Sequence, residues 1–145
     1  AATNGDELTD GYIVTDENIV LAAYKDDNWG FYSGLANKTL TIDFDIEGTY
    51  MLSDIVIDSA AIKCGNGMCE PGTVTVYYKN AEGEWIQFGE TFTSAEGKTS
   101  ESYVSQIVFS VDEAVEITDL KIEASPRSGK AFVVFSEIQA MGYAK

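Results

Sequence analysis

The strongest indication of the fold is the segment Ala131-Phe-Val-Val-Phe-Ser-Glu-Ile-Gln-Ala-Met-Gly142. Its β-branched and aromatic residues indicate a long closing strand, and the strand carries one acidic side chain, Glu137. A second signal, Leu8-Thr-Asp-Gly11, lies near the start of the chain and also contains an acid. Short alternating segments fill the chain between these two signals. We therefore expect a β-sandwich in which the first and last segments of the chain lie together, with a cation as a candidate ligand between their acidic residues.

Apolar residues alternate with polar ones through most of the sequence. In residues 40–46, Leu40, Ile42, Phe44 and Ile46 alternate with polar residues, which predicts a strand with one wet face. Turn residues separate the strands at short intervals, so the pattern predicts an all-β antiparallel sandwich. The other expected strands are 55–57, 73–78, 85–92, 106–111, 117–124 and 131–141.

Residues 12–38 depart from this pattern. The segment 15–24 favours a short helix with Thr15 as its N-terminal cap. The segment 26–34 is rich in polar residues and glycine, and it is interpreted as a structured loop. Long ordered loops in small domains often carry function.

The connections between antiparallel strands fall alternately at the two ends of the sandwich. One end is expected to hold the turns 47–52, 80–84 and 112–116. The other end is expected to hold the segments 30–38, 62–72, 93–104 and 125–130. The second set is longer, is richer in glycine and contains both cysteines and the only arginine, Arg127. We therefore place the candidate binding surface at this second end.

Length and charge limit the class of protein. The 145 residues suit one domain, which we assign to residues 8–145, and residues 1–7 are interpreted as a linker remnant from a larger multidomain chain. No apolar run reaches the roughly 20 residues that span a bilayer. The net charge of −15 disfavours nucleic acid and anionic membrane surfaces as partners, although solubility alone also explains such a charge.

The two cysteines lie in Cys64-Gly-Asn-Gly-Met-Cys69. Two glycines allow this short loop to turn back on itself, so a disulfide is geometrically feasible. Zinc is excluded because the chain has no histidine and no further cysteine. We favour a structural disulfide and an extracellular, oxidising location, and two buried free thiols are the alternative.

A series of short motifs resembles one known superfamily. In chain order they are Leu8-Thr-Asp-Gly11, Trp29-Gly-Phe31, Leu40-Thr-Ile-Asp-Phe44, Val74-Thr-Val-Tyr-Tyr78, Gly83-Glu-Trp-Ile86 and Phe135-Ser-Glu-Ile138. Their order and spacing are similar to those of the discoidin, or coagulation factor 5/8 type C, superfamily, which includes the family 32 carbohydrate-binding modules. The resemblance implies a galactose-binding-like jelly roll.

The same resemblance implies a structural Ca²⁺. It assigns Asp10 and Glu137 as ligands, and Asp27 is an additional candidate from a neighbouring loop. Carboxylate and carbonyl oxygens are the ligands that Ca²⁺ prefers. The alternative is that Asp10 caps a turn and that Glu137 is a solvated residue of the last strand.

Sugar recognition requires an aromatic ring for the C–H face and polar groups for the hydroxyls. Tyr32 is expected to be the exposed ring because Gly30, Ser33 and Gly34 surround it, whereas Trp85 is expected in the core. Arg127 either binds the ligand or is a solvated loop charge. The set of candidate ligand-binding residues is Tyr32, Arg127, Trp29, Phe31, Asn28 and Asn66.

The resemblance favours a non-catalytic glycan-binding module of a secreted or cell-surface carbohydrate-active protein. The alternative is a protein–protein adhesion or scaffold module of the same fold. An enzyme is disfavoured because the chain has no histidine and no Gly-x-Ser-x-Gly motif. The galactose-type site of the superfamily commonly uses a histidine, so the resemblance does not identify the sugar.

Overall fold

The computed structural model describes residues 30–64, 69–95 and 102–145. These residues form seven strands and no helix, and no helix long and apolar enough to cross a membrane occurs among them. The predicted helix at residues 15–24 and the linker at residues 1–7 lie outside the described residues. The strands are β1 (Gly30–Ser33), β2 (Leu40–Ile62), β3 (Thr73–Lys79), β4 (Trp85–Thr93), β5 (Ser102–Ser125), β6 (Phe132–Phe135) and β7 (Glu137–Ala144).

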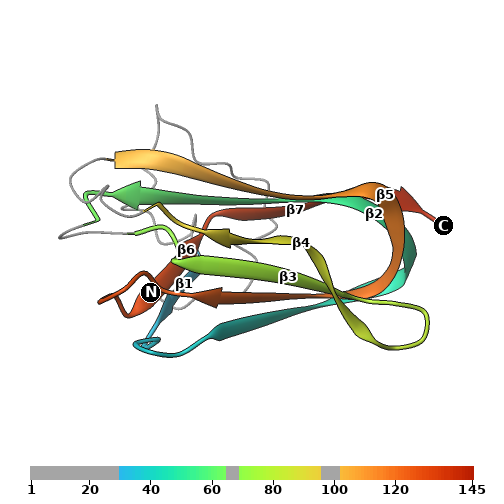
Figure 1. Cartoon of the computed structure of the whole chain (residues 1–145), viewed down its shortest axis with the longest axis horizontal. Helices are drawn as coiled ribbons and strands as arrows, with labels where there is room; N and C mark the ends of the chain where they lie inside the picture. Colours follow the sequence, from blue (N-terminus) through green and yellow to red (C-terminus); the bar gives the residue numbers. More distant parts are fainter. Residues whose placement is uncertain (1–29, 65–68, 96–101) are drawn as a thin grey trace.

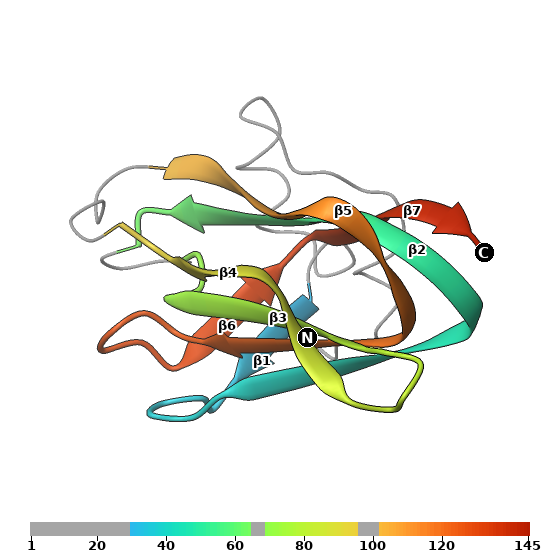
Figure 2. The ribbon, with the colours of Figure 1, turned by 45° about the vertical axis from the view of Figure 1, so that its right-hand side comes forward.

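The strands are antiparallel throughout, so the predicted all-β class is confirmed. Five strands are hydrogen-bonded in the order β4-β3-β5-β2-β7, and β1 pairs with β6 in a separate two-stranded sheet. The long strands β2 and β5 bend over together at one end, on the right in Figure 1. This bend folds the five-stranded sheet into two facing layers (Figures 1 and 2).

The turns predicted at residues 47–52 and 112–116 are wrong. The strands β2 and β5 run through both segments without ending, and between their register shifts Tyr50 lies opposite Ile117 and Leu52 opposite Val115. The register shifts between Asp45 and Tyr50 and again after Leu52. Such irregularities bend a strand sharply without ending it, so each pair of expected strands is one bent strand.

The segment 131–142 near the end of the chain contributes to both sheets. It divides at Ser136, whose backbone N–H donates to the carbonyl of Asp58 at 2.8 Å. The residues before this point form β6 and pair with β1, whereas those after it form β7 and pair with β2. The single strand predicted over residues 131–141 is therefore two strands. The loop predicted over residues 26–34 is also partly wrong, since its last residues form β1.

The core lies between the two layers. The alternation in β2 places Ile55 and Ile57 inside, where they are at most 1% exposed. Phe88 of β4 is fully buried and meets Tyr78 edge to face, with ring centroids 6.2 Å apart. Each fully buried large apolar side chain stabilises the fold by roughly 1.5–3 kcal/mol. The other large, fully buried side chains are Phe109, Phe135, Ile117, Ile122, Val74, Val76, Val133 and Val134.

The end opposite the bend gathers several loops, on the left in Figure 1. We call it the loop end and define it by residues 34–39, 62–64, 69–72, 93–95 and 125–131. Backbone hydrogen bonds join these segments: Leu35 N–H donates to the carbonyl of Ala131, Gly72 N–H to that of Ser125, and Ser94 N–H to that of Gly72, all at 2.8–2.9 Å. The described parts of the four long connections therefore meet at one end of the sandwich.

Candidate functional site at the loop end

Arg127 lies at the centre of the loop end. One guanidinium nitrogen, Nη2, donates to the backbone carbonyl of Ala95 at 3.1 Å. The other, Nη1, donates to Sγ of Cys64 at 3.6 Å. The side chain is half-buried and joins three loops that are far apart in sequence. Both of these acceptors are uncharged, so neither forms an ion pair with the guanidinium.

Two polar hollows flank the loop that carries Arg127. The larger has a volume of about 490 Å³ and the smaller about 240 Å³. Arg127 and its neighbours Ser125, Pro126 and Ser128 line both of them. The larger hollow is also lined by Gly72, Thr73, Thr93 and Ser94, and the smaller by Asn37, Lys38, Thr39, Gly129 and Lys130.

Close packing fixes the backbone between these hollows. A Cβ at Gly72 would lie 2.7 Å from the carbonyl oxygen of Pro126, so only glycine fits there without a shift. The N–H of Lys130 donates to the carbonyl of Arg127 at 2.9 Å and closes a tight turn. The hydroxyls of Thr39 and Ser125 lie 3.2 Å apart, within hydrogen-bonding distance. Close packing and hydrogen bonds thus hold the backbone around both hollows.

A buried disulfide links two segments of the loop end. Cys64 and Cys69 are bonded, with their Cα atoms 4.7 Å apart, and both are buried. They pack with Ala61, and Tyr103 and Phe132 cover this small cluster. The disulfide therefore positions the sulfur that Arg127 contacts.

A buried carboxylate next to the disulfide was not predicted from the sequence. Glu70 is only 5% exposed and accepts hydrogen bonds from the hydroxyls of Tyr103, at 2.7 Å, and Ser105. Burial, followed by the hydrogen bond to Glu70, raises the pKa of Tyr103 to about 12. An acid between cysteine and proline in a polar loop looks solvated in the sequence. Its partners lie more than thirty residues further on, in β5.

The candidate ring Tyr32 does not have the predicted exposure. It is partly buried and packs against the main core, because β1 pairs with β6 and thereby turns Tyr32 inward. The backbone of Phe31 pairs with Val134 in the same two strands. Five other candidates lie outside the described residues: Asp10, Asp27, Asn28, Trp29 and Asn66.

Glu137 is buried rather than solvated, and it lies beside a second buried acid. It is 5% exposed and pairs across strands with Asp58, which is fully buried. Oδ1 of Asp58 accepts from Gln106 at 3.1 Å, whereas Oδ2 has no hydrogen-bond partner among the described residues. Burial raises the pKa of the Asp58 carboxyl. No group of three or more histidine, cysteine or acidic residues suited to a metal occurs in the described part of the chain.

Trp85 is on the surface, so its predicted place in the core is wrong. It is 39% exposed on the outer face of the β4-β3-β5-β2 layer. The ammonium group of Lys121 lies 4.5 Å from the ring centroid of Trp85 and 5.1 Å from that of Tyr77. Since β4 is an edge strand, its outer residues have neighbours on only one side. The ammonium covers these rings and links neighbouring strands through cation–π contacts.

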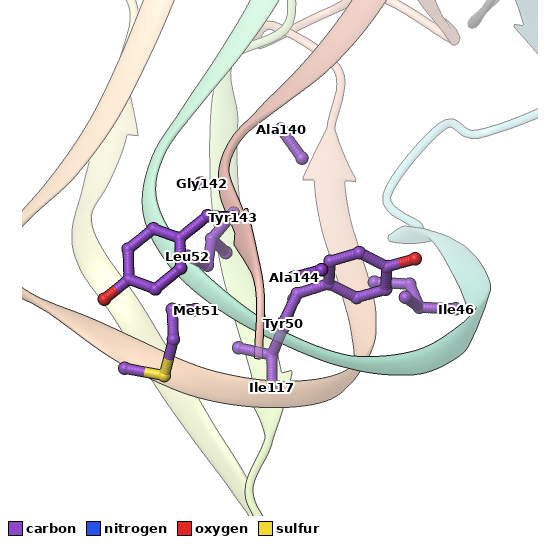
Figure 3. Close-up of a pocket in the computed structure, with 9 residues that line it drawn as sticks. All are labelled: Ile46, Tyr50, Met51, Leu52, Ile117, Ala140, Gly142, Tyr143 and Ala144. Carbon is purple, nitrogen blue, oxygen red and sulfur yellow. The ribbon is translucent and has the colours of Figure 1, made fainter.

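An apolar groove lies at the bend end, away from Arg127. Its volume is about 370 Å³, and Figure 3 shows Tyr50 and Tyr143 on either side of the last strand. Tyr143 is 62% exposed and Tyr50 37%. Aliphatic side chains make up the rest of its lining, from Ile46, Leu52, Ile117, Ala140 and Ala144, together with Met51 and Gly142.

Solved carbohydrate-binding modules share this architecture. CBM32-3 from a family 31 glycoside hydrolase of Clostridium perfringens superposes with a TM-score of 0.53 and 14% identity, over 99% of this chain and 95% of that chain. The family 32 module of C. perfringens NanJ, solved in complex with galactose, superposes with a TM-score of 0.53 and 14% identity. The match covers 77% of this chain and 74% of that chain. An F5/8 type C domain from Bacteroides fragilis superposes with a TM-score of 0.53 and 15% identity, over 88% of this chain and 82% of that chain.

These similarities define the fold class. The predicted resemblance to the discoidin superfamily and its family 32 modules is confirmed as a fold, and the chain is a discoidin-like jelly roll. No family model matches the sequence, and no curated protein matches it.

Proposed function

We propose that this protein is a non-catalytic glycan-binding module whose binding surface is the loop end around Arg127. The observation that carries the proposal is that a half-buried, positively charged guanidinium lies between two polar hollows. The fold shared with carbohydrate-binding modules supports the same function. One of those modules binds galactose in its solved structure.

The surface has the chemistry that sugar hydroxyls require. Serine and threonine hydroxyls, the Asn37 amide and the guanidinium of Arg127 offer both donors and acceptors around the hollows. A fixed backbone lowers the entropy cost of binding a small ligand. A non-catalytic role is consistent with the absence of histidine from the sequence and with a buried Glu70 whose oxygens are already hydrogen-bonded.

A structural Ca²⁺ remains part of the proposal, held by Glu137 with Asp10 and Asp27. The unpartnered Oδ2 of the buried Asp58 fits a cation in this region, because a buried carboxylate oxygen without a partner is costly. We add Asp58 to the candidate ligands for this reason. The ion would neutralise the two buried acids and fix the last strand.

The setting that we propose is extracellular, in a secreted or cell-surface carbohydrate-active protein with further domains. The Cys64–Cys69 disulfide supports an oxidising compartment. The net charge of −15 argues against nucleic acid and anionic membranes as partners.

A glycan array probed with the folded chain, followed by calorimetry on each glycan that binds, tests the function. Arg127→Ala should weaken binding at least tenfold, since the loss of a charged hydrogen bond is worth roughly 1.5–3 kcal/mol. Lys79→Ala is the matched control, because Lys79 lies on the outer sheet face with its ammonium 3.9 Å from Asp119. A folded, calcium-loaded sample that binds no glycan would contradict the proposal.

One observation favours the alternative, an adhesion or scaffold module. The groove with Tyr50 and Tyr143 is apolar, which suits a protein partner better than a sugar. Tyr143→Ser would then weaken partner binding and leave glycan binding unchanged. The groove and the Arg127 surface lie at opposite ends of the sandwich, so single variants separate the two functions.

A further inference from the structure

Charge is distributed unevenly between the loop end and the rest of the chain. The whole chain carries nine basic and 24 acidic residues. The described loop-end segments carry four basic residues, Lys38, Lys63, Arg127 and Lys130, and a single acid, Glu70. Glu70 is buried and hydrogen-bonded to Tyr103 and Ser105. The charges that these segments present to solvent are therefore all positive, on a strongly acidic protein.

Arg127 and Lys38 are the cations that matter most for a ligand. The described part of the chain gives neither of them a carboxylate partner, since its ion pairs are Lys79 with Asp119 and Lys145 with Glu116. Arg127 lines both hollows, and Lys38 lines the smaller one beside it. An anion placed next to Arg127 would thus meet a cation whose orientation the Ala95 and Cys64 contacts already fix.

The described loop end also offers no large exposed aromatic ring. The exposed large apolar side chains among the described residues lie elsewhere, and Tyr32 packs on the core. A ligand at the described loop end would therefore rely on hydrogen bonds and charge more than on ring stacking. A guanidinium binds carboxylate and sulfate groups through two parallel N–H donors.

We infer that the ligand is an anionic sugar, whose carboxylate or sulfate group binds at Arg127 beside Lys38. This inference rests on the proposed function and specifies its substrate class. The net negative charge of the protein does not forbid such a ligand. At physiological ionic strength charges are screened within about 8 Å, so the cations in contact with the ligand outweigh distant acids.

The test compares sugars that differ only in one charged group. Galactose, galacturonic acid and galactose 6-sulfate, each as the same short oligosaccharide, are titrated into the folded chain by calorimetry or NMR. At least one acidic form should bind about tenfold or more tightly than the neutral form. The carboxylated and sulfated arms identify which anion is preferred.

Two variants connect the preference to the structure. Arg127→Gln and Lys38→Gln should each reduce the preference for the acidic sugar at least threefold while neutral-sugar binding changes less, as expected for charge-assisted contacts. Lys38 is exposed, so its replacement leaves the fold intact, and Lys79→Gln is the control that should change nothing. Equal binding of acidic and neutral sugars would overturn the inference and leave the proposed function standing. The absence of any sugar binding would overturn both.

Discussion

The guanidinium of Arg127 contacts the sulfur of Cys64 across 63 positions of sequence, with Nη1 3.6 Å from Sγ. This contact links the candidate binding residue to the disulfide. The disulfide therefore has two effects. It closes a short loop, and it provides one of the contacts that orient the arginine.

Removal of the disulfide should affect both stability and binding. Cys64→Ala/Cys69→Ala should lower the free energy of unfolding by about 2 kcal/mol, the value expected from the entropy of closing so short a loop. It should also weaken ligand binding, because Arg127 loses the contact with Sγ. Urea unfolding of the double variant and of the wild type with and without reductant measures the first effect. If reductant does not change the unfolding midpoint of the wild type, the structural role of the disulfide is wrong.

The hydrogen bond from Tyr103 to Glu70 should stabilise the loop end. Tyr103→Phe leaves one oxygen of a buried carboxylate without this donor, which typically costs about 1–3 kcal/mol. Tyr143→Phe is the control, since Tyr143 is 62% exposed. Thermal or urea unfolding of the two variants provides the comparison, and equal losses of stability would contradict the role of Glu70.

Tyr103 should also lower the free energy of unfolding as the pH rises into the alkaline range. Its pKa is about 12 in the folded protein against 10.0 for the free side chain. Between these values the unfolded chain releases a proton that the folded protein retains, so stability falls as the pH rises above 10. Urea unfolding at several pH values should show a steeper alkaline loss for the wild type than for Tyr103→Phe. Parallel curves would contradict the raised pKa.

Replacement of Asp58 should change the stability of the protein differently with and without Ca²⁺. In the presence of a chelator, Asp58→Asn should raise the free energy of unfolding by about 1 kcal/mol, because it removes a buried charge whose Oδ2 has no partner. If Ca²⁺ binds beside Glu137, the ion should raise the Tm of the wild type, and both Asp58→Asn and Glu137→Gln should reduce that rise. Calorimetric scans with Ca²⁺ and with chelator measure both effects.

The exposed Asp43 provides the control for these scans, and Asp43→Asn should behave as the wild type does. Identical calcium-dependent shifts in the wild type and in Asp58→Asn would exclude Asp58 as a ligand. A wild-type Tm that does not respond to Ca²⁺ would exclude the ion itself.

The packing of Gly72 against Pro126 should be intolerant of a side chain. Gly72→Ala places a Cβ 2.7 Å from a backbone oxygen, and overpacking of this kind costs about 1–3 kcal/mol. Ser128→Ala, at an exposed position in the Arg127 loop, should have little effect. Unfolding midpoints decide between these outcomes. A Gly72→Ala variant as stable as the wild type would show that the loop adjusts easily.

The alternation of apolar and polar residues was sufficient to predict the all-β class and the end at which the loops gather. Alternation does not show whether two strands are joined by a turn or by a bend. The segments 47–52 and 112–116 contain turn-forming residues, yet β2 and β5 continue through them with shifted register and do not end. The division of the closing stretch at Ser136 depends on its contact with Asp58, which is distant in sequence.

The site was predicted only in part for the same reason. Arg127 was identifiable as the single arginine in a glycine-containing loop. The exposure of Tyr32 and Trp85 depends on which strand lies beside each ring, and local sequence does not contain this information. The burial of Glu70 and Asp58 likewise arises from pairing across long sequence separations.

A ligand titration followed by two-dimensional ¹⁵N NMR of the folded chain tests whether the loop end around Arg127 is the binding surface. The probe is the oligosaccharide that binds best in the array. The largest amide shifts should fall at residues 37–39, 72–73, 93–95 and 125–130, around Arg127. Shifts concentrated at residues 46–52 and 140–144 would instead place the ligand in the groove of Tyr50 and Tyr143 and rule out the loop end as its site.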